Sequence, residues 1–442
     1  AAIRAAQLGL KTACIERERL GGVCLNWGCI PSKALLKTAE LAQKVRHAED
    51  FGLHTGPLTI DFPKVIARSR GIADRFQKGV AGLFKKYKVD ALFGDATPTD
   101  AHTVVLRGAD GERTLTTRHL LLATGARART FPTIQPDGDR ILTYRDAIVL
   151  DRLPPSVIIL GAGAIGMEFA WFWNAMGARV TLLEGLDEVL PLEDRECGRE
   201  ARRAFERVGI DVRTSTLVDR VERDADGCVV HLRAGEPLHA HTVLVALGIT
   251  PNSELAATLG CRLDARGFVE VDPSHRTSVP DVYAVGDCCN GGPALAHVAT
   301  RQAHVCVERL AGLHVPDVDY GAMPSCTYCQ PQVASVGLTE AALQKANRPY
   351  RVGRFPFAAN GRSQGAGTPD GFAKVLVDPT TGELLGAHLV GADATELIGE
   401  VVLARSGEIT AEWLVHTMHA HPTASEAVME ATANALGVGV HL

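Results

Sequence analysis

The chain has 442 residues, of which 46% are hydrophobic and 22% are charged, and its formal net charge at pH 7 is −5. This length suits about three domains of ordinary size, and the charge balance offers no basic footprint for nucleic acid or an anionic membrane surface. The cysteines, 11 in number and scattered, argue against a secreted disulfide framework and favour a reducing compartment.

The first residues, AAIRAAQLGLKTACIERE, are predicted to form the second half of a helix and then a strand that ends at Glu16. They contain neither an initiator Met nor the apolar segment of a signal peptide. In a dinucleotide-binding unit, a strand and a glycine-rich turn come before such a helix, and neither precedes it here. We therefore expect the native chain to begin upstream.

Two cysteines follow in the segment GGVCLNWGCIPSK, residues 21–33. Within a regular helix the Cα atoms of Cys24 and Cys29 would be more than ~7 Å apart, beyond the reach of a relaxed disulfide. A bonded pair therefore needs an irregular backbone, which Gly28 and Pro31 supply. The run after them predicts a helix with Cys29 at its N-terminus, where the helix dipole favours a thiolate. Such a pair suits thiol–disulfide exchange, but two buried cysteines or half of a metal site agree with the spacing equally well.

A dinucleotide-binding unit is predicted around VIILGAGAIGMEFA, where Gly161, Gly163 and Gly166 lie between a β-branched run and a helix. The glycines permit a tight turn and a close approach of the backbone to a pyrophosphate at the helix N-terminus. The next strand, ARVTLLE, ends at Glu184, whose carboxylate can accept a ribose hydroxyl and would repel a 2′-phosphate. The pattern favours NAD over NADP; the alternative is an acid that simply ends a strand in solvent.

Other segments indicate α/β organisation, because strand-like apolar runs alternate with amphipathic helical ones. HLLLATGA runs into Gly125, and DVYAVGDCC contains Gly286 and Asp287 at a predicted strand end. Both could belong to a cofactor site or be ordinary strand ends. Residues 156–178 are nearly apolar, but Glu168 and three early glycines within them argue against a membrane span.

Four further cysteines have suggestive spacings. Cys326 and Cys329 form a C-x-x-C within SCTYCQPQVASVGL, but that stretch is predicted to be extended, and no second C-x-x-C completes a zinc site. Cys288 and Cys289 are adjacent, a spacing that strains a disulfide. We interpret the first two as structural cysteines and the other two as free thiols, and we predict no metal site.

The segment GGVCLNWGCIPSK resembles the redox-disulfide motif of the flavin-dependent pyridine nucleotide–disulfide oxidoreductases. ATGA, TSVPDVYAVGD, LAHVA, QVASVGLTE and HAHPTASEA match further motifs of that family, so the resemblance covers nearly the whole chain. IPSK and GLDEV differ from the glutathione-reducing branch, which has two lysines after the proline and basic residues after the second glycine motif. The C-terminal LGVGVHL lacks the cysteine pair of the mercury-reducing branch. The sequence is most similar to the branch that oxidises dihydrolipoyl groups.

The resemblance implies an α/β fold with two Rossmann-like dinucleotide-binding domains, one for FAD and one for NAD, and a C-terminal α+β dimerisation domain. We assign the FAD domain to residues 1–143, the NAD domain to 144–276, a central segment that completes the FAD site to 277–320, and the interface domain to 321–442. A homodimer is therefore expected.

The resemblance also implies catalytic roles. Cys24 is similar to the interchange thiol that meets the substrate, and Cys29 to the thiol that lies against the flavin. His421 and Glu426 resemble the acid–base dyad of an HPTxxE motif. A thiol must lose its proton before it can attack a disulfide, and a histidine oriented by a carboxylate can accept that proton and return it. Without the resemblance, His421 would be a packed histidine or, with two neighbouring histidines, part of a metal cluster.

The remaining candidates bind cofactors by the same resemblance. Lys33 and Glu168 look like an ion pair beside the reactive face of the flavin, although each could be a solvated helix charge. Glu16 matches the acid that binds the adenosine ribose of FAD, and Asp287 the acid that binds its ribityl chain. The predicted cofactor-binding residues are Glu16, Lys33, Gly125, Asp287, Gly161, Gly163, Gly166, Glu168, Glu184 and Gly248.

The implied function is the oxidation of protein-bound dihydrolipoyl groups by the Cys24–Cys29 disulfide and FAD, with reduction of NAD+. The implied partners are a second copy of the chain and the lipoyl domains of a 2-oxo acid dehydrogenase complex or of the glycine cleavage system, with no nucleic acid or membrane. The compartment would be the cytoplasm of a bacterium, or the mitochondrial matrix of a eukaryote. A related FAD disulfide reductase for another small disulfide and a flavin-free structural subunit are the alternatives.

Three residues depart from the family pattern. Gln302 and Ala303 stand where Glu-Gly is usual, and Gln332 stands where Glu is usual. They could change hydrogen bonds near a cofactor or at the interface, but they do not involve the redox pair.

Overall fold

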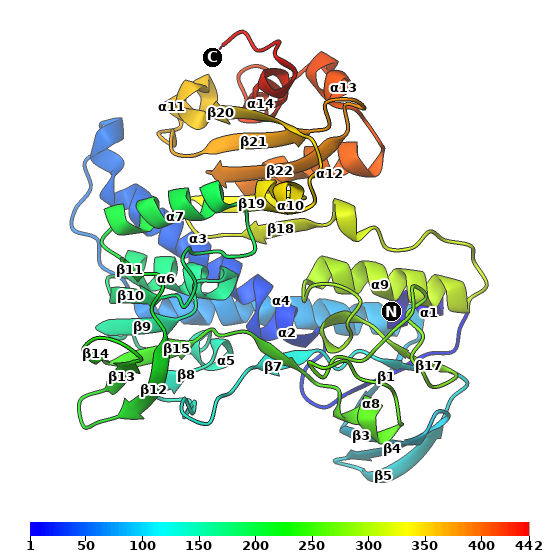
Figure 1. Cartoon of the computed structure of the whole chain (residues 1–442). Helices are drawn as coiled ribbons and strands as arrows, with labels where there is room; N and C mark the ends of the chain where they lie inside the picture. Colours follow the sequence, from blue (N-terminus) through cyan, green and yellow to red (C-terminus); the bar gives the residue numbers. More distant parts are fainter. Residues whose placement is uncertain (442) are drawn as a thin grey trace. The chain divides into compact units, whose positions relative to one another are not determined.

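The computed structural model describes residues 1–441 (Figure 1). They divide into two compact units, each assembled from separate stretches of chain. Unit 1 comprises residues 1–34, 67–129 and 247–320, and unit 2 comprises residues 35–66, 130–246 and 321–441. Both units combine helices with parallel and antiparallel strand pairing, which confirms the predicted α/β class.

Unit 1 is built from short strands between helices. Its parallel pairs join β1 (Ala13–Glu16) to β2 (Asp90–Phe93), and β6 (Leu120–Leu122) to β17 (Val282–Ala284). Every residue of β17 is buried, as expected for a parallel strand covered on both faces. The other elements are α1 (Ala2–Gln7), α2 (Gly22–Trp27), the antiparallel sheet of β3 (Asp95–Asp100), β4 (Thr103–Gly108) and β5 (Gly111–Thr116), the antiparallel pair of β7 (Ala126–Ala128) and β16 (Ile249–Pro251), α8 (Glu254–Thr258), η2 (Gly286–Cys288) and α9 (Ala296–Leu310).

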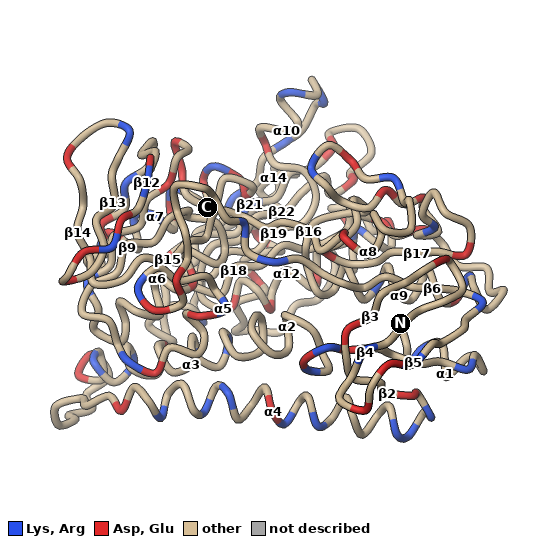
Figure 2. The backbone as a smooth tube through the Cα atoms, turned by 90° about the horizontal axis from the view of Figure 1, so that it is seen from below, with Lys and Arg blue, Asp and Glu red and all other residues tan. Residues whose placement is uncertain are grey.

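Three elements contribute residues to both units: α3 (Cys29–Arg46), α4 (Phe62–Tyr87) and η3 (Tyr320–Ala322). Helix α3 starts at Cys29, which confirms the helix start predicted there. Lys and Arg far outnumber acidic residues along α4 (Figure 2). Two of these arginines, Arg68 and Arg70, donate hydrogen bonds to backbone carbonyls of the segment that carries the two cysteines.

Unit 2 contains a five-stranded parallel sheet in the order β11-β10-β9-β15-β8. Strand β9 (Ser156–Leu160) is buried throughout, and the glycine-rich turn after it leads into α6 (Ala164–Met176) and then β10 (Arg179–Leu183). The order β11-β10-β9 is that of half a Rossmann fold, so the predicted strand, turn, helix and strand are confirmed. The same part of the unit includes β8 (Ile141–Leu142), α5 (Tyr144–Ala147), α7 (Arg195–Arg207), β11 (Asp211–Arg213) and β15 (Thr242–Val245). It also includes the antiparallel sheet of β12 (Val218–Arg223), β13 (Cys228–Leu232) and β14 (Leu238–Ala240). The helical turn η1 (Ala48–Phe51) belongs to unit 2 as well.

The C-terminal part of unit 2 is an antiparallel sheet in the order β18-β19-β22-β21-β20 with helices packed on it. Val375 and Leu389 from the sheet share one hydrophobic core with Val401 and Val428 from two of these helices. The strands are β18 (Pro324–Thr327), β19 (Gln332–Gly337), β20 (Arg351–Pro356), β21 (Phe372–Val377) and β22 (Leu384–Gly391), and the helical elements are α10 (Glu340–Lys345), η4 (Phe357–Ala359), α11 (Gly361–Gly365), α12 (Ala394–Ser406), α13 (Ala411–His416) and α14 (Glu426–Leu436).

The apolar stretch at residues 156–178 forms β9, a turn and α6. Within residues 1–441, no helix is both long enough and apolar enough to cross a membrane. The division into four segments given above stays a prediction, because the two compact units do not correspond one to one with these segments.

Candidate functional site

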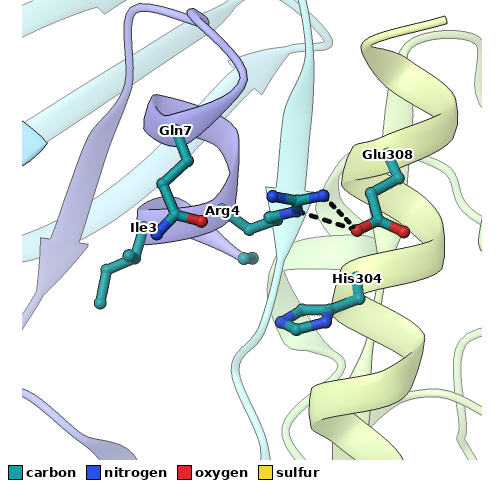
Figure 3. A pocket seen from close by; sticks show the side chains of 6 residues that line it. Ile3, Arg4, Gln7, His304 and Glu308 are labelled. Atoms are coloured by element: carbon teal, nitrogen blue, oxygen red, sulfur yellow. Dashed lines mark hydrogen bonds and ion pairs between the residues drawn. The ribbon is translucent and has the colours of Figure 1, made fainter. Parts of the chain in front are cut away.

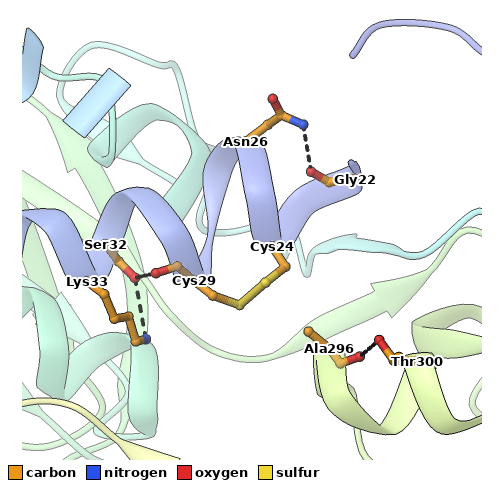
Figure 4. Close-up of a disulfide and its surroundings, with 8 residues drawn as sticks. All are labelled: Gly22, Cys24, Asn26, Cys29, Ser32, Lys33, Ala296 and Thr300. Carbon is orange, nitrogen blue, oxygen red and sulfur yellow. Dashed lines mark hydrogen bonds between the residues drawn. A yellow bond between two sulfur atoms is a disulfide. The ribbon is translucent and has the colours of Figure 1, made fainter. Parts of the chain in front are cut away.

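A disulfide joins the two cysteines of the predicted redox pair (Figure 4). Cys24 lies in α2 and Cys29 is the first residue of α3, and Gly28 between the helices has φ −130° and ψ −116°. This break in the helix brings the two Cα atoms to 4.7 Å, which is within disulfide range. The irregular backbone predicted for a bonded pair is confirmed, and half of a metal site is excluded because both sulfurs are bonded.

Hydrogen bonds to backbone carbonyls hold residues 21–34, which we call the redox segment. The fully buried Asn26 donates from Nδ2 to the carbonyls of Leu20 and Gly22, each at 3.0 Å. Ser32 Oγ donates to the carbonyl of Cys29 at 3.2 Å (Figure 4). These donors do not change protonation near neutral pH.

Helix α4 supports the same segment from its side. Ser69 Oγ donates to the carbonyl of Pro31 at 2.9 Å, and Arg70 donates to the carbonyl of Asn26. Burial and the neighbouring Arg19 lower the pKa of Arg70, but a guanidinium keeps its proton in proteins. These hydrogen bonds to the redox segment therefore keep their protons over the physiological pH range.

The predicted FAD-binding residues of unit 1 lie at strand ends. Glu16 ends β1 and accepts a hydrogen bond from the backbone N–H of Glu18 at 2.9 Å. Gly125, with φ +68°, follows β6, and Asp287 follows the neighbouring parallel strand β17, so both lie beyond the carboxyl ends of paired strands. Burial raises the pKa of the Asp287 carboxyl, and no group in the described part of the chain donates a hydrogen bond to it.

Gln302 is a departure from the family pattern that, by sequence, could change hydrogen bonds near a cofactor or at the interface. This residue on α9 is almost fully buried, and its Oε1 accepts a hydrogen bond from the N–H of Gly286 at 2.8 Å. Its Nε2 donates to the carbonyl of Gly291 at 2.7 Å and to the hydroxyl of Tyr320 at 3.0 Å. Gln302 thus shapes the loop that carries Asp287.

Three more of the predicted cofactor-binding residues, Lys33, Glu168 and Gly248, each have their own local contacts in the structure. Lys33 Nζ lies 3.4 Å from Ser32 Oγ (Figure 4). Glu168 is buried in α6, and its Oε1 accepts a hydrogen bond from the N–H of Tyr328 at 3.0 Å. Gly248, with φ +96°, precedes β16, and its carbonyl accepts from the N–H of Arg129 at 3.0 Å. Because Lys33 and Glu168 belong to different units, their ion pair stays a prediction.

The predicted NAD-binding turn is tightly packed. Gly161 has φ +98°, and Gly163 is the N-cap of α6. A Cβ atom on Gly166 would lie 1.9 Å from the carbonyl oxygen of Gly161, so no side chain can replace that glycine without moving the helix. The helix therefore starts directly against the turn, which is the arrangement that presents backbone N–H groups to a pyrophosphate.

Glu184 is buried at the end of β10 rather than exposed to solvent. Its Oε2 accepts a hydrogen bond from the N–H of Ala162 in the glycine turn at 2.8 Å, and its Oε1 accepts from the N–H of Leu186 at 2.9 Å. A carboxylate has about four acceptor sites, so these two bonds leave room for a ribose hydroxyl. The side chain joins the turn to the strand end.

His421 and Glu426 are hydrogen-bonded to each other, with Nδ1 of the imidazole 2.9 Å from Oε1 of the carboxylate. The other oxygen, Oε2, accepts from the N–H of Thr423 at 2.8 Å. Burial alone would raise the pKa of Glu426, but the hydrogen bonds from Thr423 and His421 outweigh it and lower this pKa. The His421 side chain is 79% exposed, and its Nε2 is the ring nitrogen left to exchange a proton.

The two residues belong to residues 417–426, which we call the histidine loop. Asn360 anchors this loop by donating from Nδ2 to the carbonyl of Thr423 at 2.9 Å. Its Oδ1 accepts from the N–H of Ser363 at 2.9 Å and caps α11. No motif in the sequence indicated this anchor, because Asn360 and Thr423 are 63 positions apart.

The remaining cysteines are not disulfide-bonded, including Cys288 and Cys289. Cys326 lies on β18 and Cys329 in the turn before β19, so the extended conformation predicted for their stretch is confirmed. In the described part of the chain, no three or more His, Cys, Asp or Glu side chains are grouped so that they could hold a metal ion. Gln332 Oε1 accepts from the N–H and the hydroxyl of Thr395, at 3.1 and 2.8 Å, near the start of α12.

A cavity of about 580 Å³ in unit 1 is unrelated to these residues (Figure 3). Helices α1 and α9 line it, and Arg4 Nε donates to Glu308 Oε1 across it at 2.8 Å. Its lining residues are Ala1, Ile3, Arg4, Gln7, His304 and Glu308. None of them is a predicted site residue.

Comparison with known proteins gives matches over nearly the whole chain. Residues 1–303 match the family described as pyridine nucleotide-disulphide oxidoreductase, and residues 323–432 match its dimerisation domain. A protein named dihydrolipoyl dehydrogenase from Rhizobium etli is 45% identical over 99% of this chain and 95% of its own length. One of the same name from Chlorobaculum tepidum is 43% identical, over 99% of this chain and 94% of its own. The crystal structure of LpdA from Mycobacterium tuberculosis superposes with a TM-score of 0.90 at 28% identity, covering 97% of this chain and 96% of that one.

Proposed function

The chain belongs to the pyridine nucleotide-disulphide oxidoreductase family, and we infer that it catalyses the dihydrolipoyl dehydrogenase reaction. A dihydrolipoyl dithiol is oxidised to the lipoyl disulfide, and its two electrons pass through the Cys24–Cys29 pair and FAD to NAD+. The observation that carries this inference is the disulfide at the start of α3, in a chain whose relatives carry that name.

The residues present suit both cofactors. The Asp287 carboxyl is partly buried and has no hydrogen-bond donor within residues 1–441, so it suits the hydroxyls of a ribityl chain, since buried polar groups are normally paired. The glycine turn before α6, with Glu184 tied to it, suits the pyrophosphate and ribose of NAD+. When bound, FAD accepts the electron pair of a dithiol and NAD+ accepts a hydride.

We assign the proton transfer to His421. Glu426 accepts the hydrogen bond from Nδ1, so in the neutral imidazole Nε2 carries no proton and can take one from a substrate thiol. The resulting imidazolium is stabilised by the ionised Glu426 carboxylate at 2.9 Å. The low pKa of Glu426 keeps that carboxylate charged over the working pH range.

We assign the sulfur chemistry to Cys24 and Cys29. The substrate thiolate attacks Sγ of Cys24, so a substrate–Cys24 bond forms while the Cys24–Cys29 bond breaks. Cys29 leaves as a thiolate at the N-terminus of α3, where the unpaired backbone N–H groups and the helix dipole stabilise its charge. The second substrate thiol then attacks the first substrate sulfur, and its proton passes to the departing Sγ of Cys24. Lipoyl disulfide leaves, and two electrons remain in the cysteine pair.

The dimerisation domain supports a homodimer. Within it Leu403 on α12, Trp413 on α13 and Met418 after α13 are exposed in the single chain, Met418 to 96%. Large exposed apolar side chains suit burial against a second copy. We propose lipoyl domains of a 2-oxo acid dehydrogenase complex or of the glycine cleavage system as substrates, and the bacterial relatives favour the cytoplasm as the compartment.

The activity is tested with dihydrolipoamide and NAD+. We expect NADH formation by a yellow protein whose flavin spectrum bleaches on addition of dihydrolipoamide. NADPH-dependent reduction of another small disulfide, without dihydrolipoamide oxidation, would instead favour a related disulfide reductase. A colourless and inactive full-length protein would contradict the proposal and leave a structural role.

Coenzyme choice is tested at Glu184. Glu184→Ala combined with Leu186→Arg should move preference toward NADP+ by a factor of ~10 or more, which equals about 1.4 kcal/mol. The measurement is the ratio of kcat/KM for the two coenzymes, with Glu188→Arg, which changes the net charge by the same amount, as a control on the same loop. An unchanged ratio would mean that Glu184 only ties the glycine turn to the strand end.

A further inference from the structure

A second histidine–carboxylate pair lies beside the His421–Glu426 dyad. His419 Nε2 lies 2.7 Å from Oε1 of Glu400 on α12, and its Nδ1 lies 2.9 Å from the carbonyl oxygen of Thr417. The His419 side chain is only 6% exposed, in contrast to the largely exposed ring of His421. Both ring nitrogens of His419 therefore face oxygen atoms of the protein.

The chemistry of these two oxygen atoms determines which nitrogens of His419 carry protons. A backbone carbonyl can only accept, so Nδ1 must carry a proton. A neutral imidazole with its proton on Nδ1 would then turn the lone pair of Nε2 toward the carboxylate, which is repulsive at 2.7 Å. Both hydrogen bonds of the ring can form only when one more proton lies between Nε2 and Glu400. The pair is then an imidazolium and a carboxylate with no net charge, and its positive end is His419.

The positive end belongs to the same loop as the dyad. His419 is two residues before His421 in the histidine loop. Its charge contributes to the lowered pKa of Glu426, behind burial, which opposes the shift, the hydrogen bonds from Thr423 and His421, and the charge of His421. The charged groups that face His419 are Glu400 from α12 and Glu426 from the start of α14. His419 belongs to the same loop as the dyad, whereas Glu400 lies on α12, so we take the cation as the charge of the pair that acts on the dyad.

We propose that His419 is a positioning residue, whose imidazolium is held by Glu400, orders the histidine loop and presents a fixed positive charge to the His421–Glu426 dyad. Its ring ties the loop to α12 on one side and to the carbonyl of Thr417 on the other. The charge favours the ionised form of Glu426, which in turn holds Nδ1 of His421. This inference rests on the proposed function, in which the dyad transfers the substrate proton.

The charge is tested with Glu400→Gln, His419→Gln and the double variant in the FAD-loaded dimer. A glutamine at position 400 can donate an N–H to an unprotonated Nε2, so Glu400→Gln leaves His419 in place but neutral. His419→Gln removes the cation and leaves the Glu400 carboxylate alone. Glu396→Gln, one turn earlier on an exposed part of α12, and His416→Gln, exposed at the end of α13, are the matched controls.

The readout is the acid limb of the pH profile of kcat/KM for dihydrolipoamide. Loss of a nearby cation makes the dyad bind its proton more readily, so Glu400→Gln should move this limb to higher pH by about 0.3 to 0.7 unit, a loss of about two- to five-fold on the limb. His419→Gln should move it further. Adding Glu400→Gln to His419→Gln should then move the limb back toward lower pH, because an isolated anion is removed.

This reversal of sign is the decisive result, because a purely structural role would lower activity equally at every pH. Parallel profiles for all three variants, or shifts equal to those of the controls, would overturn the proposal. Nitrogen chemical shifts of 15N-labelled histidine provide a readout without turnover, which keeps the test informative if a variant folds poorly. Both nitrogens of His419 should carry a proton in the wild type, and only one in Glu400→Gln. A neutral His419 in the wild type would overturn the proposal even if dihydrolipoamide oxidation is confirmed, and absence of that activity would overturn only the proposed function.

Discussion

The redox segment and the histidine loop each place two functional side chains five positions apart, but they are held by different forces. Cys24 and Cys29 are joined covalently, and their surroundings donate hydrogen bonds from amides, hydroxyls and guanidinium groups to carbonyls. His421 and Glu426 are joined by a hydrogen bond, and a carboxylate and a second histidine stabilise their loop. Electron transfer thus has a scaffold whose donors keep their protons, whereas proton transfer has a scaffold built from histidines and carboxylates.

The difference follows from the chemistry of each region. A disulfide changes its bonding during turnover, so the backbone around it must keep its shape while the covalent link is absent. Hydrogen bonds to carbonyls achieve this with donors that keep their protons near neutral pH. A base must instead change its charge in each cycle, and nearby ionised groups set how easily it does so.

The largest expected effect comes from the redox segment. Cys24→Ser and Cys29→Ser should each lower dihydrolipoamide oxidation by at least about three orders of magnitude, because no disulfide remains to be attacked. Their folds should persist, since closing so short a loop contributes little stability. Activity and thermal unfolding midpoints check both statements, with Cys228→Ser, at a buried cysteine of β13, as the control.

The two variants also separate the roles of the thiols. Cys29 is at the N-terminus of α3, so in Cys24→Ser the remaining thiol should react with iodoacetamide at lower pH than the thiol of Cys29→Ser. Reaction at lower pH in Cys29→Ser would reverse the roles assigned above.

The second prediction asks whether the two regions act within one chain or between two. The family resemblance implies a dimer in which each disulfide faces the histidine of the other subunit. Inactive homodimers of Cys29→Ser and His421→Gln are dissociated together and allowed to reassociate, which makes about half of the dimers mixed. If the site is shared, one of the two sites in each mixed dimer has no mutation, and activity should recover to ~25% of wild type.

The outcome depends only on symmetry and on random mixing. If each histidine serves its own chain, both sites of a mixed dimer are broken and activity stays at the level of the parent variants. That result, with mixed dimers shown to be present by mass spectrometry, would contradict the shared site. Two-fold closure of the dimer is what places two equivalent sites across one axis.

The two regions also differ in how far the sequence predicts them. The redox segment is local: Gly28 breaks the helix between Cys24 and Cys29, so composition and spacing within a few residues indicate the geometry. The histidine loop has no such local signal, and His421 was identified only through a family resemblance. Its anchor Asn360 lies on a different element, where only the fold brings it to the loop.

The same reasoning applies to the cofactor sites. The glycines before α6 and the acid at position 184 follow from a motif with fixed spacing. No motif predicts the hydrogen bond that buried Glu184 accepts from Ala162, or the three hydrogen bonds of Gln302. The partners in these bonds are set by how strands and helices pack. Long-range contacts between buried polar groups are therefore the feature of the site that motif spacing in the sequence does not predict.

The third prediction concerns the neutral anchor of the histidine loop. Asn360→Ala removes the hydrogen bond to the carbonyl of Thr423 and the cap of α11, which together should lower stability by about 1–2 kcal/mol. We expect kcat/KM to fall several-fold at every pH, with the acid limb of the profile unmoved, because no charge is lost. A shifted limb would mean that loop position, rather than charge, sets the proton affinity of the dyad.

The last prediction separates catalytic protonation from acid unfolding. His275 in unit 1 is 2% exposed, and neither of its ring nitrogens has a hydrogen-bond partner in the described part of the chain. Its pKa is lowered to about 4, chiefly by burial; Asp272 and Asp317 oppose the shift and Arg309 adds to it. In the unfolded chain an ordinary histidine titrates near 6.5, so the unfolded state binds the proton first. Stability should therefore be fully present above about pH 7 and decline as the pH falls toward 4.

His275→Leu removes this proton-binding group, and both residues carry a Cβ at the same left-handed φ of +62°. Between pH 7 and pH 5 the wild type should lose about 2 kcal/mol more stability than the variant, which a plot of thermal unfolding midpoint against pH will show. The acid limb of kcat/KM should be the same in both proteins, because His275 lies outside the redox segment and the histidine loop. If His275→Leu moves that limb, the limb reports loss of the fold rather than protonation of the His421–Glu426 dyad. The contrast drawn here between the redox segment and the histidine loop would then be wrong. If the unfolding midpoints of the two proteins fall in parallel, the buried imidazole does not titrate with folding, and the acid sensitivity of the fold has its source in other groups.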